Sequence, residues 1–305
     1  QASITAIAAA GATTLATASS DHFLTLWSVG EQKQIDQWLI QADESELPAI
    51  TRLAITADGK RLASGHSDGQ LIFWNLQSDP QPTQQGDPKP KHFQQSVAGN
   101  KQAVTSLRFS PDETTLLAGY ADGVFRGFNP DNAQQRFATS HGARINDIAI
   151  SNDGKVIATA GQNNSVRLWQ SNGSGFGVSQ VNQLPGPATS VTLSPDGSQV
   201  IVAVQAESPI CLIHETAQGK LLQQYTQHKN SIAALMTDQQ GRIGSLDATS
   251  IQRWSTNGLK VIAGHNDQIT SLAAIPNAPL QVISGSRDST AKRWDLNSAR
   301  QVTQF

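Results

Sequence analysis

The chain has 305 residues, with 22 basic and 24 acidic side chains and a net charge of −2. This near-neutral balance gives no extended positive surface, so we expect no binding to nucleic acid or to an anionic membrane. No apolar run approaches the roughly 20 residues that a membrane-spanning helix needs, so direct membrane insertion is not expected. The single cysteine, Cys211, excludes an internal disulfide.

Large side chains recur along the chain at near-regular intervals. Five of them are tryptophans, and a phenylalanine and a histidine fill the two gaps. We call the seven the marker residues: Trp27, Trp74, Phe128, Trp169, His214, Trp254 and Trp294, which are 47, 54, 41, 45, 40 and 40 residues apart. A period of about 40–45 residues indicates a repeat architecture rather than one irregular core.

The text around the markers repeats as well. Each copy has a short apolar segment, a small-residue turn with Asp or Asn, and a second segment that ends in Trp and a polar residue. Three copies are RLASGHSDGQLIFWN at 61–75, VIATAGQNNSVRLWQ at 156–170 and VISGSRDSTAKRWD at 282–295. This pattern resembles the WD-repeat family, with repeats of bacterial type, although only 294–295 is a literal Trp-Asp pair. The resemblance covers residues 1–305 and implies an all-β fold, a seven-bladed β-propeller of four-stranded antiparallel blades in a single domain.

Each expected blade has strands a to d, from the centre of the ring outward. Strand a begins 23 to 25 residues before the marker, at Ile4, Ile50, Val104, Ile145 and Ile269. The expected blades are approximately 1–40, 41–99, 100–140, 141–184, 185–227, 228–264 and 265–305. All strands can be drawn in chain order, so we expect the ring to close by packing between the first and last blades. Two insertions break the spacing, at 41–48 on the top face, where the d–a loops emerge, and at the proline-rich 76–91 on the bottom face.

The resemblance also implies a structural tetrad of His in the d–a loop, Ser or Thr on strand b, Asp in the b–c turn and Trp on strand c. The last blade matches it completely, with His265, Ser284, Asp288 and Trp294. The fourth blade matches with Asn in place of Asp, as His141, Thr159, Asn163 and Trp169. The other blades match in part: the second has no loop His, the third has Asp122 and Phe128, the sixth has His228 with Asp247 one place early, and the fifth is the most degraded.

Ser, His and Asp are also the residue types of a hydrolase catalytic triad, so a catalytic role is an alternative hypothesis. A nucleophilic Ser must be exposed beside an oxyanion hole, and one good copy is enough. The graded recurrence of the set around the ring indicates a scaffold device instead, and we expect no enzyme activity. Histidines lack the paired spacing of metal sites, and no calcium loop or Gly-rich phosphate loop occurs, so no metal, cofactor or small-molecule substrate is expected. Cys211 is expected to be a small buried apolar residue rather than a reactive thiol.

In the WD-repeat family, partners dock on the top face, through two residues at the entry to strand a and the residue before the b–c turn Asp. In the first three blades these positions are small and hydroxylated. The candidate partner-binding residues lie in later blades: Arg144, Asn146, Gln162, Glu207, Gln268 and Arg287. Arg144 and Arg287 are the expected anchors of a charged sector, with Asp43, Glu44 and Glu46 on the same face. The insertions and Trp38, expected to pack on its own blade, are the alternative docking elements.

These features favour a non-enzymatic protein–protein interaction scaffold, or a subunit of a larger assembly, that binds one or more protein partners. The alternative is a sensory or regulatory propeller domain of a larger bacterial signalling protein. An enzyme with its site in the central channel would need carboxylates or histidines converging from the a strands, which are expected to be apolar or hydroxylated. A cytoplasmic location is favoured, and a periplasmic one follows if the absence of an initial Met reflects signal-peptide removal.

Overall fold

The computed structural model describes residues 2–11, 13–40, 48–77, 92–171, 176–226, 228, 230–238, 240–247, 251–255, 258–262, 264–275 and 281–305. Within these residues the chain forms 28 strands. Blades 1 to 4 contain β1 Ile4–Ala10, β2 Thr14–Ser19, β3 Phe23–Ser28, β4 Lys33–Leu39, β5 Ile50–Ile55, β6 Arg61–His66, β7 Leu71–Asn75, β8 Phe93–Val97, β9 Val104–Phe109, β10 Leu116–Tyr120, β11 Val124–Phe128, β12 Gln135–Ser140, β13 Ile145–Ile150, β14 Val156–Gly161, β15 Ser165–Ser171 and β16 Phe176–Gln183. Blades 5 to 7 contain β17 Ala188–Leu193, β18 Gln199–Val204, β19 Ile210–Glu215, β20 Leu221–Tyr225, β21 Ala234–Thr237, β22 Ile243–Leu246, β23 Ile251–Ser255, β24 Gly258–Ile262, β25 Ile269–Ala274, β26 Gln281–Ser286, β27 Ala291–Asp295 and β28 Arg300–Gln304.

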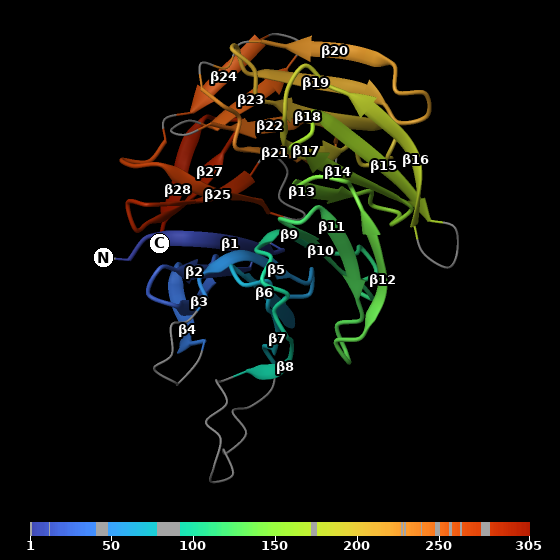
Figure 1. The fold of residues 1–305 in the computed structure, drawn as a ribbon. Coiled ribbons are helices and arrows are strands. Elements are labelled where there is room, and N and C mark those ends of the chain that lie inside the picture. The colour runs from blue at the N-terminus through green and yellow to red at the C-terminus, as the bar shows by residue number, and fades with distance from the viewer. Residues whose placement is uncertain are drawn as a thin grey trace.

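In the described part of the chain the strands make seven sheets of four, each in chain order. Every strand pair is antiparallel, from the β1–β2 pair of the first blade to the β27–β28 pair of the last. The inner strands β1, β5, β9, β13, β17, β21 and β25 contact one another in succession, and β25 contacts β1. Figure 1 shows these strands around the centre and the fourth strand of each sheet at the periphery. The prediction of an all-β propeller with four-stranded antiparallel blades is confirmed.

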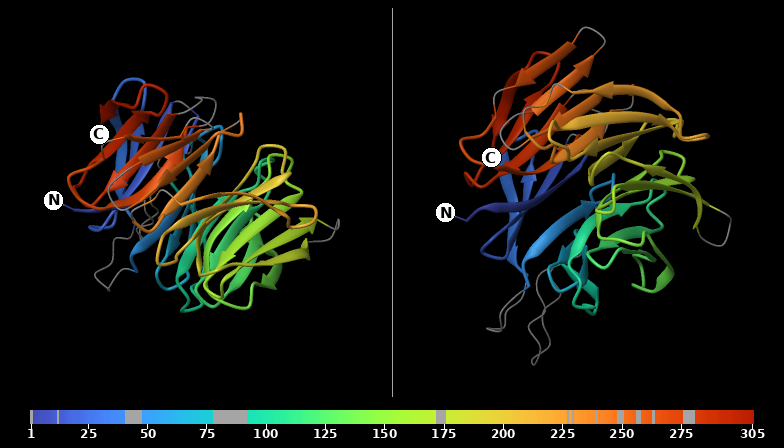
Figure 2. Two further views of the ribbon diagram at one scale, coloured as in Figure 1. Left: turned by 90° about the horizontal axis from the view of Figure 1, so that it is seen from above. Right: turned by 45° about the horizontal axis from the view of Figure 1, so that its top comes forward.

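The first and last blades lie side by side, and the two termini are close together in each view of Figure 2. The fourth strand of the last blade is β28, so the ring closes by packing between β25 and β26 of that blade and β1. No helix that could cross a membrane is present among the described residues.

The turns between strands a and b are fixed by side chains that the sequence repeats. In four blades a Ser or Thr hydroxyl donates to the Asp carboxylate two residues later, as Ser194 does to Asp196 at 2.5 Å. Hydrogen bonds from Ser194, from the Ser198 N–H and from the Ser198 hydroxyl lower the pKa of Asp196 to about 2. Gly197 follows with φ of 69°, a left-handed conformation that favours glycine. The Ser-Pro-Asp-Gly text therefore specifies a tight hairpin at the bottom of the blade.

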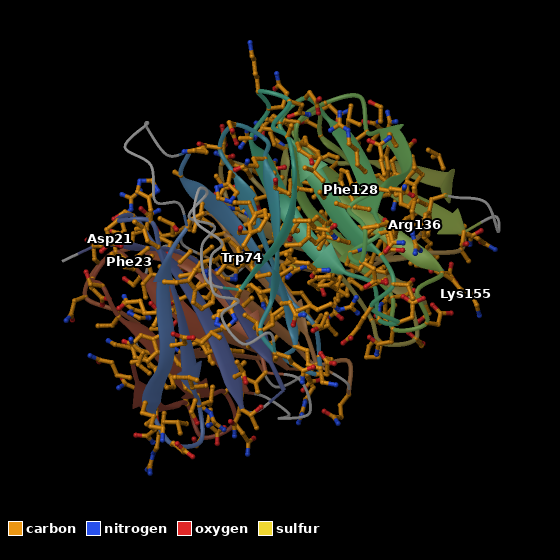
Figure 3. The ribbon with its side chains drawn as sticks, turned by 90° about the horizontal axis from the view of Figure 1, so that it is seen from below. Asp21, Phe23, Trp74, Phe128, Arg136 and Lys155 are labelled. Carbon is orange, nitrogen blue, oxygen red and sulfur yellow. The ribbon has the colours of Figure 1, made fainter. Side chains whose placement is uncertain are left out.

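Apolar residues pack between blades rather than in one central core. One buried cluster joins Leu53 and Trp74 of blade 2 to Trp38 of blade 1. Trp38 is only 5% exposed and its ring centroid is 5.8 Å from that of Trp74, so it packs on the neighbouring blade and is closed to a partner. The prediction that Trp38 packs on its own blade was therefore incomplete. Figure 3, seen from below, shows Trp74 and Phe128 among the packed strands.

Small residues on strand b allow this close packing. A Cβ added to Gly65 would lie 2.5 Å from Val104 Cγ1 of the next blade. A Cβ on Gly285 would lie 2.7 Å from Ile4 Cγ2, across the joint between the last and first blades. Because such contacts are too short for carbon atoms, glycine sets the separation between these blades.

A polar side chain near the start of strand a also joins neighbouring blades. Thr51 Oγ1 donates to Val104 O, Thr189 Oγ1 to Ile232 O and Thr270 Oγ1 to Ile4 O, each at 2.7 Å. In blade 4 the same bond comes from Asn146 Nδ2 to Ala188 O, also at 2.7 Å. Three threonine hydroxyls and one amide from the expected docking positions are therefore used inside the ring.

The two predicted insertions fall largely on residues 41–47 and 78–91, which lie outside the described residues, as do Asp43, Glu44 and Glu46. The strands next to them in the chain are β4 before the first insertion and β8 after the second.

Candidate functional site

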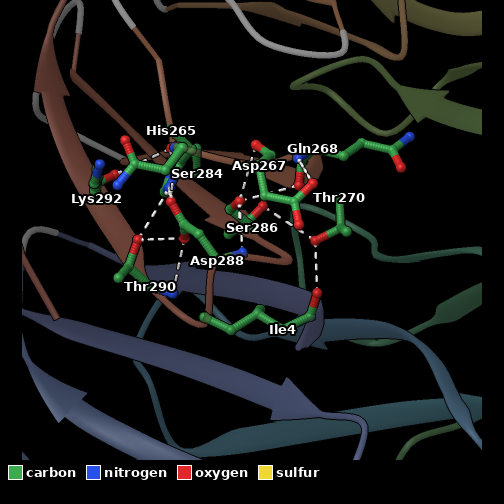
Figure 4. A network of polar contacts seen from close by, with 12 residues as sticks. Ile4, His265, Asp267, Gln268, Thr270, Ser284, Ser286, Asp288, Thr290 and Lys292 are labelled. Carbon is green, nitrogen blue, oxygen red and sulfur yellow. Dashed lines mark hydrogen bonds and ion pairs between the residues drawn. The ribbon is translucent and has the colours of Figure 1, made fainter. Parts of the chain in front are cut away.

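The last blade contains a continuous chain of hydrogen bonds among the four residues of the expected tetrad. Figure 4 shows three of them, His265, Ser284 and Asp288. The Trp294 indole N–H donates to Ser284 Oγ at 2.7 Å, and Ser284 Oγ lies 2.7 Å from His265 Nε2. His265 Nδ1 is 3.0 Å from Asp288 Oδ2. With Nδ1 protonated, the imidazole donates to the carboxylate and accepts from the serine, so each group in the chain has a partner.

Burial, charge and hydrogen bonding determine the protonation states of His265 and Asp288 in this hydrogen-bonded chain. Burial lowers the pKa of His265, and the charge of Asp288 opposes that effect only in part. Burial also disfavours the charge of Asp288, but hydrogen bonds from Thr290 and the Asn266 N–H, together with His265, outweigh it and lower its pKa to about 2. At neutral pH the pair is therefore a neutral imidazole and an ionised carboxylate.

Blade 4 has an equivalent chain that ends on an amide. The Trp169 indole N–H donates to Thr159 Oγ1 at 2.9 Å, and Thr159 Oγ1 lies 2.7 Å from His141 Nδ1. His141 Nε2 is 3.2 Å from Asn163 Oδ1 and 3.0 Å from Ser165 Oγ. Burial, followed by the nearby charge of Arg167, lowers the pKa of His141 to about 4.

In blades 2 and 6 the structure supplies partners that the sequence analysis missed. His66, two residues after Ser64 on β6, places its Nε2 3.0 Å from Ser64 Oγ and so replaces the missing loop histidine. The available signal was the spacing of two residues, which puts both side chains on one face of a strand. In blade 6, Ser245 Oγ accepts from Trp254 and lies 2.7 Å from His228 Nε2, and His228 Nδ1 is 3.6 Å from Asp247.

Blade 3 uses a different set of polar side chains. Asp122 Oδ2 is 3.7 Å from Arg126 Nη2, and the Arg126 guanidinium lies 4.5 Å from the centre of the Tyr120 ring. Asp122 therefore has a partner, although the histidine and serine of the tetrad are replaced.

The tetrads are closed to substrates. Ser284 has no exposed surface, and its oxygen already accepts from Trp294 and contacts His265. A nucleophilic serine must reach a substrate carbonyl beside hydrogen-bond donors for the oxyanion, and this position allows neither. Among the described residues no group of three His, Cys, Asp or Glu side chains could hold a metal ion.

The six candidate partner-binding residues do not form one surface. Gln162 N donates to Arg144 O at 3.0 Å, and Asn146 Nδ2 donates to Gln162 Oε1 at 3.1 Å, so three of them make one group on blade 4. Arg287 N donates to Gln268 O at 3.0 Å on blade 7.

Two of the expectations about these residues need correction. Blade 4 contacts blades 3 and 5, whereas blade 7 contacts blades 6 and 1, so Arg144 and Arg287 are not in one sector. In blade 5 the residue bonded to the strand entry is Gln205, whose N–H donates to Pro187 O at 2.9 Å. Glu207 is an exposed residue two positions further on.

Charged residues converge at the upper end of the central channel, contrary to the expectation that the a strands are apolar or hydroxylated. A cavity of about 140 Å³ there is lined by residues of all seven inner strands, including Arg52, Arg108 and Asp147. Asp147 Oδ1 accepts from Ser106 Oγ at 3.1 Å and Oδ2 from Ser190 Oγ at 2.7 Å, which links blades 3, 4 and 5. Arg108 Nη2 is 3.9 Å from Asp147 Oδ1.

Arg52 is the least compensated member of this group. It is open to the channel but surrounded by protein, and this desolvation lowers its pKa. Asp147 opposes the effect, whereas the charges of Arg108 and Arg144 lower the pKa further. Arg52 Nη1 donates to Thr51 O at 2.6 Å. The charges of two other arginines thus act on Arg52 next to the carboxylate of Asp147. The sequence analysis did not predict this polar site.

A protein-family model described as "WD domain, G-beta repeat" matches residues 43–75, 91–129, 133–170 and 256–295, and each segment ends one residue after a marker. The chain belongs to the WD-repeat family. This WD-repeat protein is 26% identical to human striatin-3 over 303 residues, a match that covers 95% of the chain and 34% of striatin-3. It thus spans about a third of the length of that relative.

The chain is also similar in sequence or in fold to other proteins. The chain is 22% identical over 298 residues to a WDS homologue of Arabidopsis thaliana, covering 92% of this chain and 53% of that protein. It is 28% identical over 163 residues to a WD repeat-containing protein of Synechocystis, covering 50% and 40% of the two. A chain in the crystal structure of the mitotic checkpoint complex has the same fold, with a TM-score of 0.78, 16% identity, and coverage of 95% of this chain and 86% of that one.

Proposed function

We propose that this seven-bladed propeller is a non-enzymatic docking platform that holds a protein partner over its top face, as a scaffold or as a subunit of a larger assembly. The observation that carries this proposal is the rigid presentation of exposed polar side chains. The backbones of Arg144, Gln162, Gln268 and Arg287 are fixed by hydrogen bonds between strand entries and b–c turns, while the side chains are exposed. Because the backbone is already ordered, partner binding has to order only the side chains of these residues.

The buried tetrads and the net charge fit a protein-docking platform better than an enzyme or a nucleic-acid-binding protein. The tetrads are buried, so they stabilise blades rather than act on a substrate. The net charge of −2 favours protein over nucleic acid as the partner.

A regulatory propeller within a longer bacterial signalling protein is the second candidate. It is favoured by the match to only a third of striatin-3 and by the match to a Synechocystis protein.

Site-specific photo-crosslinking tests the docking proposal. A photoreactive amino acid is placed at Gln162 or Gln268 on the top face and, as matched controls, at Lys155 in the bottom turn or Arg136 on the outer strand β12. We expect cross-links from the two top positions to one and the same protein, and none from the controls. Cross-links from Lys155 or Arg136 alone, or from no position, would contradict docking on the top face.

A further inference from the structure

The inner strands show where this chain departs from its own repeat. The third residues of the seven inner segments are Ala6, Arg52, Ser106, Asp147, Ser190, Ala234 and Ser271. All of them except Ser190 line the upper cavity. The fifth residues are Ala8, Ala54, Arg108, Ala149, Thr192, Met236 and Ala273. Blades 1, 5 and 7 have a small residue at both positions, so a long cationic side chain there is not a requirement of the fold. Arg52 and Arg108 come from adjacent blades and line the same cavity.

The carboxylate of Asp147, which carries the negative charge in the channel, already accepts hydrogen bonds from several protein groups. Besides the two serine hydroxyls, Asp147 Oδ1 accepts from the Ile148 N–H at 2.8 Å and Oδ2 from the Val191 N–H at 3.2 Å. Its four hydrogen-bond donors hold this carboxylate rigidly between the blades. Among the described residues its nearest ion-pair partner is Arg108. Among the described residues that line the cavity, Arg52 and Arg108 stand against the single carboxylate of Asp147. Arg144 is close enough for its charge to lower the pKa of Arg52, so the upper channel has an excess of positive charge.

The volume of the upper cavity limits the size of the ligand that it can bind. A volume of about 140 Å³ is below the roughly 300–1,000 Å³ of sites for drug-sized molecules, but it exceeds the share of several waters. A second cavity of about 350 Å³ continues below it along the channel and shares Leu53, Leu107 and Arg108 with it. The lower cavity is lined mainly by aliphatic side chains, so the polar binding capacity is concentrated at the top.

We propose that the upper channel binds an oxyanion, supplied as the carboxylate of an acidic segment of the partner that docks on the top face. The inference rests on the docking function proposed above and specifies its chemistry. Guanidinium groups bind carboxylates with paired, directional hydrogen bonds, and these are stronger where water is scarce. Arg52 and Arg108 lie in the wall of the upper cavity, and Arg144 is exposed directly before the inner strand β13.

The test titrates the purified chain with hexaglutamate, with hexaglutamine of the same length and with inorganic phosphate, using calorimetry. The variants are Arg52→Gln, Arg144→Gln and their combination. The matched control is Arg136→Gln, an exposed arginine on the outer strand β12 that loses the same charge away from the channel. Melting curves verify the fold, and Arg144→Gln alone serves if the variant in the channel wall does not fold.

We expect hexaglutamate to bind and hexaglutamine not to bind. The combined variant should weaken hexaglutamate binding at least about tenfold, Arg144→Gln alone should weaken it severalfold, and Arg136→Gln should leave it unchanged. Affinity should also fall as salt rises.

Equal loss in the Arg136 control, or full binding by the combined variant, would overturn the channel site. Arginine-dependent binding of phosphate without binding of hexaglutamate would overturn the assignment to a partner's carboxylate. Top-face cross-links without arginine-dependent peptide binding would refute the channel site and leave the docking function standing. Peptide binding without top-face cross-links would refute the docking function instead.

Discussion

The Thr270 hydroxyl donates a 2.7 Å hydrogen bond to the carbonyl oxygen of Ile4, across the joint where the last blade meets the first (Figure 4). The same hydroxyl lies 3.0 Å from Gly285 O on its own blade. Gly285 in turn lets Ile4 approach its backbone more closely than any Cβ would allow. These contacts, together with the packing of β25 and β26 against β1, hold the last blade against the first.

Replacing Thr270 with Val should weaken ring closure. The change keeps the side-chain shape and leaves the Ile4 and Gly285 carbonyls without their donor, at a cost on the order of 1 kcal/mol. The control is Thr51→Val, which removes a hydroxyl with the same two bonds at the joint between blades 2 and 3, where the chain itself spans the joint. Hydrogen exchange of β1 and β25 should accelerate in Thr270→Val only. Equal acceleration in both variants would contradict a special role for the closing joint.

The complete tetrad predicts a difference between two aspartates in equivalent turns. Asp288→Ala removes acceptors for His265, Thr290 and the Asn266 N–H, so it leaves partly buried donors unsatisfied, at about 1–3 kcal/mol. Asp21, in the exposed turn of blade 1, contacts the Ser19 hydroxyl, and Asp21→Ala should change stability by less than about 0.5 kcal/mol. Urea unfolding of both variants measures the difference. Similar midpoints would show that the hydrogen-bonded chain contributes little.

The parts of the fold that sequence reasoning predicted are those that repeat. Ile4, Ile50, Val104, Ile145 and Ile269 each begin an inner strand, as the distance to the marker predicted. These five blades place their a, b and c strands on the same local pattern, so spacing along the chain carries that information.

Relations between blades could not be obtained in this way. Thr51 bonds to a residue 53 positions away, and Arg52 and Arg108 line one cavity because blades 2 and 3 are neighbours in the ring. His66 took a role that the family pattern assigns to another loop, since a position on strand b can reach the same serine. The first two contacts depend on where separate repeats lie in space, which the sequence of one repeat does not contain, whereas the His66–Ser64 contact lies within one strand.

Cys211 should be unreactive in the folded protein. It has no exposed surface, and burial raises the pKa of its thiol to about 12, so almost none is present as the nucleophilic thiolate at pH 8. Reaction with a thiol-specific chromogenic disulfide should be at least about 100-fold slower in buffer than in guanidinium chloride. Rapid labelling without denaturant would mean that blade 5 opens readily or that the thiol is accessible.

The buried histidines predict a loss of stability in mild acid. Burial is the main cause that lowers the pKa of His66, His141 and His265 below the ordinary value of 6.5. The histidines of the unfolded chain therefore bind protons more tightly than those of the folded chain. Their titration leaves the free energy of unfolding unchanged above pH 6.5 and lowers it as the pH falls from there toward 4. For His141 a fall from 6.5 to about 4 corresponds to roughly 3 kcal/mol over this window. Urea unfolding measured in steps from pH 7 to pH 4.5 should show this decline. In His141→Gln, stability at pH 7 should be lower because Thr159 and Asn163 lose the imidazole, but the decline toward pH 4.5 should be shallower than in the wild type. A decline of the same steepness in that variant would show that His141 is not the group that titrates.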